Sequence, residues 1–185
     1  MQPFTRSVCV FCGAREGARP AYGAAARALG ARLAERNWRL VYGAGDVGLM
    51  GEVARAAAAA GAPTLGVIPQ HLLALEQARG DLGALVVTET MHERKKVMFV
   101  NSDAIVVLPG GAGTLDEFFE VLTWRQLGLH RKPILLLDIE GYWQPLTALV
   151  DHVVGEGFAD TSLHGYLRVV PDLLALDTAL AEALD

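Results

Sequence analysis

The segment 108–117, with the sequence LPGGAGTLDE, combines glycines that expose backbone donors with two acidic side chains. Pro109 stiffens the end of an apolar run, and the glycines allow backbone N–H groups to approach an anion where a helix begins. Thr114 and Glu117 have the spacing of a capping box. Glu117 could therefore cap the helix, act as a fixed catalytic carboxylate, or do both. Asp116 and Glu117 project about 100° apart on a helix, so only one of them can face a ligand.

Basic residues gather in a second segment, TMHERKK at residues 90–96. Thr90 and Glu93 form another possible capping box, which places Arg94 to Lys96 in the first turns of a helix. Positive charges there oppose the helix dipole, by a few tenths to about 1 kcal/mol each. The cluster therefore indicates that an anion is expected, because arginine binds phosphate or carboxylate bidentately. A solvated basic face is the alternative, and His92 alone indicates nothing further.

A second glycine-rich loop, YGAGDVGLMG at residues 42–51, contains the G-x-G-x-x-G spacing of a dinucleotide-binding turn. That fingerprint also needs an acidic residue about 20 positions further on. The next apolar run instead ends VIPQH at residues 67–71. The loop therefore predicts a cradle for a phosphate or nucleoside monophosphate, with Gly43 and Gly45 among its binding residues. The alternative is a tight turn that packs a helix against the sheet.

Short apolar runs alternate with longer helix-like segments along the chain, and each of these loops follows an apolar run. The expected strands are 8–11, 39–42, 64–68, 84–88, 104–108, 134–137 and 167–170. The expected helices are 21–36, 48–60, 91–102, 114–127, 143–156 and 172–184. Continuous Val, Ile and Leu runs are typical of a sheet covered on both faces. The pattern predicts an α/β fold, a Rossmann-like doubly wound and mainly parallel sheet with helices on both faces, in one domain over residues 1–185. Ligands of such sheets bind beyond the carboxyl ends of the strands.

Composition narrows the class of protein further. The 185 residues are 52% hydrophobic and 20% charged with a net charge of −5, which excludes disorder and argues against nucleic acid as a partner. Cys9 and Cys12 lie three residues apart on an expected strand and should point to opposite faces, so we expect structural cysteines rather than a zinc or redox pair. Residues 1–6 lack the apolar core of a signal peptide, and no apolar run approaches about 20 residues. A cytoplasmic protein without membrane contact is expected.

The basic segment and the first glycine loop together resemble the paired M-H-x-R-K and P-G-G-x-G-T-x-x-E motifs of the Lonely Guy (LOG) family, here at residues 91–95 and 109–117. The similarity also includes VCVFCG at residues 8–13 and covers nearly the whole chain. Members of the family are cytokinin-activating phosphoribohydrolases, long mislabelled as lysine decarboxylases. The chain departs from the family pattern at Ala14-Arg15, where a serine pair is common, and at Ala44, which interrupts a glycine triplet. Both departures touch phosphate anchoring.

The resemblance implies hydrolysis of the N-glycosidic bond of an N6-substituted adenosine 5′-monophosphate, which releases the free base and ribose 5-phosphate. It implies Arg94 and Glu117 as the catalytic pair, no metal or other cofactor, and a homodimer with sites near the interface. A fixed carboxylate such as Glu117 suits the oxocarbenium-like transition state of glycosidic cleavage. The positions that the resemblance assigns to substrate contact are Glu76, Lys95, Gly111, Ala112, Gly113, Thr114, Leu115, Asp116 and Thr123.

Other functions stay open at this point. One is a nucleosidase that acts on AMP or other nucleoside 5′-monophosphates, and another is a non-catalytic carrier of a nucleotide or molybdenum-cofactor ligand. A carrier would not need the intact Arg94 and Glu117 pair. A pyridoxal-dependent decarboxylase is disfavoured, because it needs a Schiff-base lysine. The chain's lysines are Lys95, Lys96 and Lys132, and the first two lie in the expected anion-binding segment.

Overall fold

The computed structural model describes residues 4–73 and 83–184. Its centre is a seven-stranded sheet in the order β4-β3-β2-β1-β5-β6-β7, with every neighbouring pair parallel. The strands are β1 (Arg6–Phe11), β2 (Trp38–Tyr42), β3 (Thr64–Pro69), β4 (Ala84–Thr88), β5 (Ala104–Val107), β6 (Ile134–Leu137) and β7 (Arg168–Val170). The α-helices are α1 (Pro20–Glu35), α2 (Gly48–Ala59), α3 (Met91–Val100), α4 (Ala112–Gln126), α5 (Gln144–Gly155) and α6 (Leu173–Leu184). Short 3-10 helices are η1 (Gln70–Leu72), η3 (Ile139–Gly141) and η4 (Thr161–Tyr166). Every expected strand and helix is present, with ends shifted by at most two residues.

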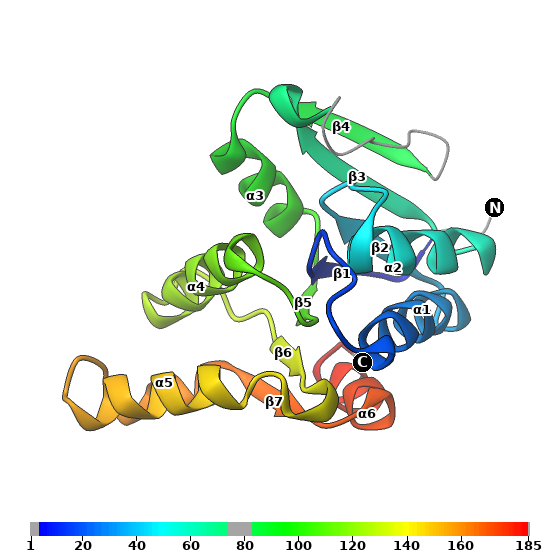
Figure 1. Ribbon diagram of the computed structural model, residues 1–185. Helices are drawn as coiled ribbons and strands as arrows, with labels where there is room; N and C mark the ends of the chain where they lie inside the picture. The colour runs from blue at the N-terminus through cyan, green and yellow to red at the C-terminus, as the bar shows by residue number, and fades with distance from the viewer. Residues whose placement is uncertain (1–3, 74–82, 185) are drawn as a thin grey trace.

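Helices cover both faces of the sheet, as Figure 1 shows. Side chains of α1, α2 and α6 pack in one core cluster and those of α3, α4 and α5 in another. Strand β1 divides its side chains between these clusters: Val8 and Val10 face the first, whereas Cys9 and Phe11 face the second. This alternation confirms the doubly wound fold.

The two cysteines follow the same alternation. Cys9 lies in the α3–α5 cluster and Cys12 in the α1–α2–α6 cluster, and both are buried free thiols. The expectation that their side chains diverge is therefore confirmed.

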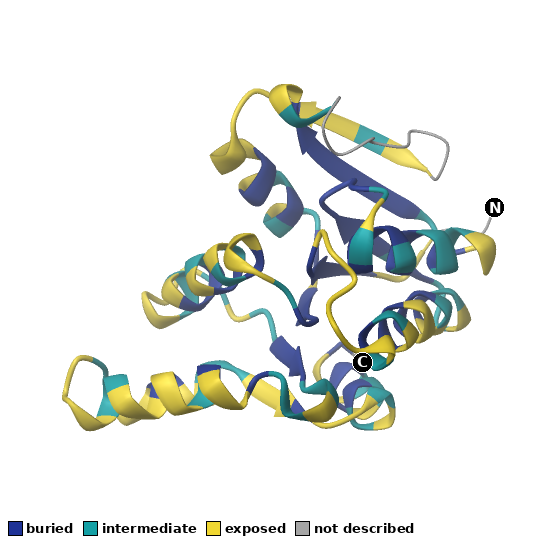
Figure 2. Ribbon diagram, in the orientation of Figure 1, coloured by how far each residue is buried: buried dark blue, intermediate teal, exposed yellow. Residues whose placement is uncertain are grey.

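Burial explains why the strands read as continuous apolar runs. The central strands β1, β5 and β6 are almost entirely buried, whereas the edge strands β4 and β7 are mostly exposed (Figure 2). A strand with a helix layer on each face has no solvent side, so alternation of apolar and polar residues is absent. No helix in the described ranges combines the length and apolarity that a bilayer span requires.

The direction in which the sheet grows reverses at β1. Strand β1 pairs with β2 on one side and with β5 on the other, and the helices that follow β1 and β5, α1 and α4, lie on opposite faces of the sheet. The loops that follow β1 and β5 therefore leave the sheet side by side, and their backbones are joined by the Gly13 N–H, which donates to the Pro109 carbonyl at 3.0 Å. In open α/β sheets this reversal point opens a crevice for ligands.

Candidate active site

A cavity of about 470 Å³ opens at the carboxyl ends of β1 and β5. Its walls come from the loop after β1 (residues 12–17), the loop after β5 with the start of α4 (residues 109–111, 113 and 114), and single side chains from other elements. Arg94 and Glu117 both line it, although they belong to different helices. The structure thus brings the two expected catalytic residues to one cavity.

The start of α4 differs from the sequence expectation and changes the role of Glu117. The helix begins at Ala112, with Gly111 as an N-cap that has no side chain to contribute, so the possible capping box of Thr114 and Glu117 is not formed. Flexible glycines allow the helix to begin two residues early, and Thr114 becomes a buried residue of its first turn. Glu117 then lies in the second turn, where its side chain lines the cavity.

Asp116 points the other way, as the helical geometry requires. Its side chain is 60% exposed, and its Oδ2 accepts from the Lys95 ammonium at 3.0 Å. The expectation that only one of the two neighbouring acids faces the ligand is confirmed, and that residue is Glu117.

Two backbone carbonyls accept hydrogen bonds from the Arg94 side chain and help to fix its position. The capping box of Thr90 and Glu93 is present, so α3 begins where the sequence predicts. The Arg94 side chain is buried, and it donates from Nε to the Val67 carbonyl at 3.1 Å and from Nη2 to the Gly43 carbonyl at 2.7 Å. Strand β3 and the loop after β2 therefore hold the guanidinium at the cavity wall.

Lys95 was expected to contact substrate, and within the described residues it does not line the cavity. Its buried ammonium lies 3.0 Å from Asp116 and 3.2 Å from Glu120 of α4. Burial alone would lower the pKa of Lys95, but the hydrogen bonds to these two carboxylates outweigh burial and the pKa is raised. Lys96 is exposed. Successive residues of a helix diverge by about 100°. Arg94 therefore faces the cavity, Lys95 faces α4 and Lys96 faces solvent.

The loop after β2 positions Arg94 and, within the described residues, does not form part of the cavity lining. Gly43 and Gly45 are buried and, so far as the structure is described, absent from the cavity lining. The Gly43 carbonyl accepts from Arg94, and the Gly45 N–H donates to Met50 Sδ at 3.1 Å. Gly48 packs so closely that a methyl there would lie 2.3 Å from the carbonyl carbon of Ala14. The loop therefore has the packing of the alternative, a tight turn, and the phosphate cradle expected at Gly43 and Gly45 has no support from the described cavity lining.

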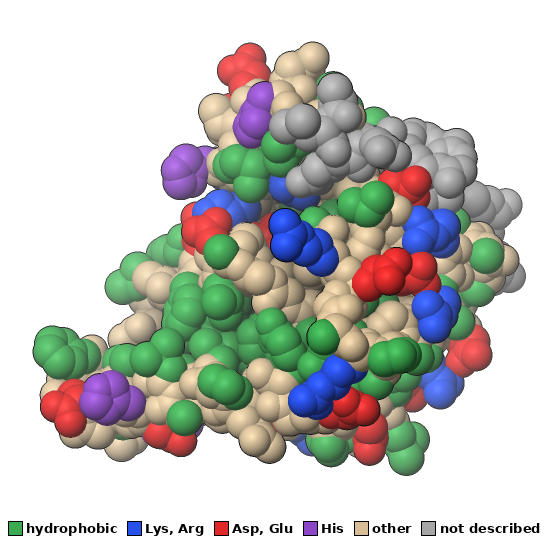
Figure 3. Space-filling view, in the orientation of Figure 1, with side chains coloured by type: hydrophobic (Ala, Val, Ile, Leu, Met, Phe, Trp, Pro, Cys, Tyr) green, Lys and Arg blue, Asp and Glu red, His purple; other side chains and the backbone are tan. Residues whose placement is uncertain are grey.

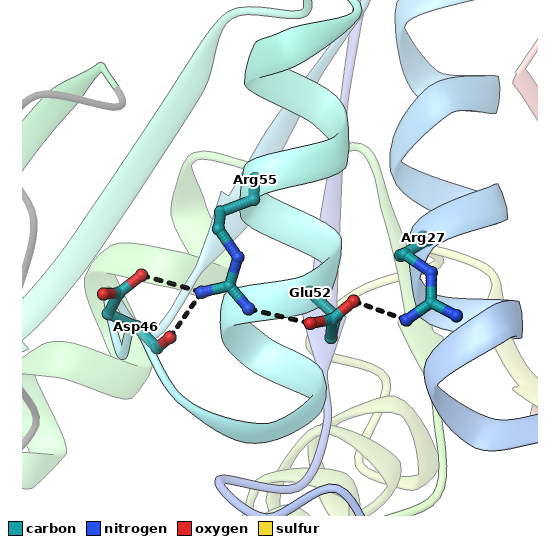
Figure 4. A network of polar contacts seen from close by, with 4 residues as sticks. All are labelled: Arg27, Asp46, Glu52 and Arg55. Carbon is teal, nitrogen blue, oxygen red and sulfur yellow. Dashed lines mark hydrogen bonds and ion pairs between the residues drawn. The ribbon is translucent and has the colours of Figure 1, made fainter. Parts of the chain in front are cut away.

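A network of ion pairs holds this loop from outside (Figure 4). Arg55 of α2 donates to the Asp46 carbonyl at 2.6 Å and pairs with the Asp46 carboxylate at 2.9 Å. Glu52 joins Arg55 to Arg27 of α1 at 2.8 and 2.6 Å. The two arginines lower the pKa of Glu52 through hydrogen bonds. Helices α1 and α2 and the loop whose carbonyl orients Arg94 are thus tied together.

The remaining expected contact residues divide into three groups. Gly111, Gly113 and Thr114 line the cavity. Ala112, Leu115, Asp116 and Thr123 do not line it in the part of the chain that is described. Glu76 lies outside the described residues. Thr123 is exposed on α4, nine residues beyond Thr114.

Two tyrosines that the sequence did not single out complete the wall. Tyr22 of α1 and Tyr142, which follows η3, meet edge to face with ring centroids 5.5 Å apart, and both line the cavity. The Tyr142 hydroxyl donates to the Gly110 carbonyl at 2.6 Å and so fixes the glycine turn. Their positions in the sequence could have indicated this, because each tyrosine comes shortly after a loop at the carboxyl edge of the sheet.

Burial and two charged residues of the cavity lining shift the pKa of the Cys12 thiol. Burial raises the pKa of Cys12 far above its ordinary value, the negative charge of Glu117 raises it further, and the positive charge of Arg94 opposes these effects. The thiol is therefore protonated, and the two charges that act on it are the two expected catalytic groups.

Comparison with known proteins gives relatives in sequence and in structure. A family model described as "Possible lysine decarboxylase" matches residues 50–180. A probable cytokinin riboside 5′-monophosphate phosphoribohydrolase of Oryza sativa subsp. japonica is 45% identical over 178 residues, 96% of this chain and 77% of the relative. A cytokinin riboside 5′-monophosphate phosphoribohydrolase of Rhodococcoides fascians is 44% identical over 173 residues, 93% of this chain and 87% of the relative.

Solved structures show the same fold at lower identity. The Moco carrier protein of Chlamydomonas reinhardtii superimposes with a TM-score of 0.74 at 21% identity, covering 97% of this chain and 98% of its own. The molybdenum cofactor binding protein of Rippkaea orientalis gives 0.73 at 20% identity, covering 98% of each chain. At this identity the likeness is one of fold.

Proposed function

The chain belongs to the LOG family of cytokinin riboside 5′-monophosphate phosphoribohydrolases, and we propose that it hydrolyses the N-glycosidic bond of N6-substituted adenosine 5′-monophosphates. The products are the free base and ribose 5-phosphate. The observation that carries the proposal is that Arg94 and Glu117, from separate helices, line one cavity at the sheet's reversal point.

Glu117 supplies the negative charge that the reaction needs. As the bond between ribose C1′ and the base nitrogen breaks, its electron pair leaves with the base and the sugar becomes oxocarbenium-like. The Glu117 carboxylate stabilises this positive charge and orients a water molecule toward C1′. The water adds its oxygen to C1′ and gives up one proton, and the departing base takes one.

Arg94 and the apolar wall position the substrate. The Arg94 guanidinium, fixed by the Gly43 and Val67 carbonyls, orients the ribose phosphate unit or the Glu117 carboxylate. The base packs against the apolar side chains of the wall, which include Leu49, Met50 and Met91. The N–H groups at the start of α4 offer donors to the phosphate.

Replacement of Glu117 tests the mechanism. Glu117→Gln removes the charge and keeps the shape, so we expect base release from isopentenyladenosine monophosphate to fall by about 10²- to 10⁴-fold in kcat. Asp116→Asn is the matched control, because that neighbour faces away from the cavity; its kcat should stay within about threefold of the parent. The same assay with AMP shows whether an N6 substituent is required. A Glu117→Gln variant as fast as the parent would refute the assignment, and a parent that releases no base from either nucleotide would favour a carrier.

We also propose that the protein is a homodimer. Thr123, a contact position by resemblance, is exposed and lies away from the cavity of its own chain, so a second copy would have to bring it to a substrate. Exposed hydrophobic side chains on the same helix layer support such a contact, namely Val100, Phe119 and Leu149. Figure 3 shows hydrophobic side chains gathered on the side of the molecule where α4 and α5 lie. The buried free thiols of Cys9 and Cys12 suit a reducing cytoplasm, which we propose as its compartment.

A further inference from the structure

Two cations line the cavity among the described residues, and they differ in what they already bind. Arg94 directs Nε and Nη2 to the Val67 and Gly43 carbonyls. The side chain of Arg15 forms no hydrogen bond or ion pair with any residue in the described ranges 4–73 and 83–184. The donors of Arg15 are therefore available to a ligand, whereas much of Arg94 is occupied in holding its own position.

Backbone contacts on both sides fix the loop that carries Arg15. The loop after β1 is joined to the loop after β5 through Gly13 and Pro109, and the Met50 N–H donates to the Gly13 carbonyl at 3.3 Å. Gly48 packs against Ala14 from the other side. Arg15 is therefore held at the rim of the cavity, on the loop that lies beside the glycine turn 110–113.

A phosphate bound in this cavity needs a positively charged side chain with free donors, such as Arg15, to balance its charge. A phosphate monoester carries a charge of about −1.5 to −2 near pH 7. The described part of the cavity lining contributes two carboxylates, Glu16 and Glu117. Backbone N–H groups at the glycine turn supply only partial charges, equivalent to roughly half an elementary charge at a helix start. A guanidinium can add a full charge and two parallel hydrogen bonds.

We propose that Arg15 binds the 5′-phosphate of the substrate and thereby selects nucleoside monophosphates over nucleosides. The inference rests on the proposed function, because it assumes that a ribose 5-phosphate unit occupies the cavity. If Arg15 binds the phosphate, the phosphate lies between the glycine turn 110–113 and Arg15. The sugar carbon that reacts then faces Glu117.

The first test separates binding from chemistry. For Arg15→Gln we expect KM for isopentenyladenosine monophosphate to rise by about 10- to 100-fold, the loss of a charge-assisted bidentate contact, with kcat within about threefold. Turnover of the phosphate-free riboside should not change. Arg19→Gln is the matched control, because Arg19 is an exposed arginine four residues away that pairs with Glu140 and does not line this cavity in the described structure. An unchanged KM for Arg15→Gln, or equal losses for monophosphate and riboside, would overturn the inference.

The second test does not depend on catalysis. Calorimetric titration with ribose 5-phosphate should show a Kd that is about 10- to 100-fold weaker for Arg15→Gln than for the parent, and largely restored in Arg15→Lys. Glu16→Gln should bind at least as tightly as the parent, because it removes a like charge. A parent that binds ribose 5-phosphate through Arg15 but releases no base would refute the proposed function and leave this inference standing. Equal binding by parent and Arg15→Gln, or no binding by the parent, would refute the inference itself.

Discussion

On α3 and on α4, one residue faces the cavity and its neighbour in sequence forms an ion pair outside the cavity. Arg94 and Glu117 face the cavity, while the next residue on α3 and the preceding residue on α4, Lys95 and Asp116, meet outside it at 3.0 Å. Glu120 adds a second carboxylate to Lys95, and its Oε2 is buried without a hydrogen-bond partner among the described residues. The ion pairs therefore join α3 and α4, the two helices that carry the proposed catalytic residues Arg94 and Glu117.

The Lys95 ammonium should make stability depend on pH in the alkaline range. Its pKa is raised above the ordinary value of 10.5 in the folded protein, because its hydrogen bonds to Asp116 and Glu120 outweigh the opposing effect of burial. A raised folded pKa means that the folded state binds this proton more tightly than the unfolded chain does. The stabilisation is therefore complete below pH 10.5 and is lost as the pH rises through the folded value.

Lys95→Met measures this contribution. At pH 7 we expect the free energy of unfolding to fall by about 1–3 kcal/mol, because the Glu120 carboxylate loses its partner. The difference from the parent should persist to about pH 9.5 and shrink above 10.5. Denaturant titrations across this range give both values. Lys96→Met, an exposed neighbour, should stay within about 0.5 kcal/mol of the parent. A difference between Lys95→Met and the parent that does not change with pH would show that the ammonium is not the stabilising group.

The sequence predicted which residue types meet at the site better than it predicted which way each one points. Arg94 and Glu117 line one cavity, as expected of motifs at the ends of parallel strands, which converge on one edge of the sheet. Lys95 and Gly43 were also expected to contact substrate, and neither lines the cavity within the described residues. Their orientation depends on the rotation of α3 about its axis and on a carbonyl that Arg94 reaches across 51 positions of sequence, which no local pattern encodes.

At the scale of elements, the pattern of apolar residues predicted the strands and helices well, and their first and last residues less well. The two-residue error at the start of α4 had the largest consequence, since it excludes the capping role that the sequence had left open for Glu117 and leaves the residue in the cavity wall. A glycine N-cap leaves no side-chain signal, whereas the Thr90 and Glu93 capping box on α3 was correctly predicted. The starts of α3 and α4 therefore differ in how far a side chain marks them in the sequence.

The contact between α1 and α2 offers a test at the same scale. A methyl group on Gly30 would lie 2.4 Å from the Val53 carbonyl oxygen and 2.8 Å from the Ala57 nitrogen, so the helices touch backbone to backbone. Gly30→Ala should therefore lower the free energy of unfolding by about 1–3 kcal/mol despite the better helix propensity of alanine. Gly155→Ala in α5, where nothing lies within 4 Å, should raise it by about 0.5–1 kcal/mol. Equal effects in thermal or denaturant unfolding would contradict this close packing.

At the scale of the whole molecule, strand order decides which distant residues share the cavity. The reversal between β1 and β5 places the loop of Arg15 beside the glycine turn, and the next strand outward, β6, brings Tyr142 onto the Gly110 carbonyl. The alternation of strands and helices predicted the class of fold and the edge at which ligands bind. It did not predict the strand order, and the tyrosine wall could not be expected without it.

The proposed homodimer is tested on the helix layer formed by α3, α4 and α5. Phe119 is 37% exposed on α4, one helical turn from Thr123, and the parent should behave as twice its 19.8 kDa mass in light scattering. Phe119→Arg places like charges opposite one another across a two-fold contact and should give a monomer. Leu174→Arg, 74% exposed on α6 behind the opposite face of the sheet, should remain a dimer.

If Thr123 reaches the partner's cavity, base release by the Phe119→Arg monomer falls together with its mass. A Phe119→Arg dimer would place the contact elsewhere, and a monomeric parent with full activity would show that each chain carries a complete site.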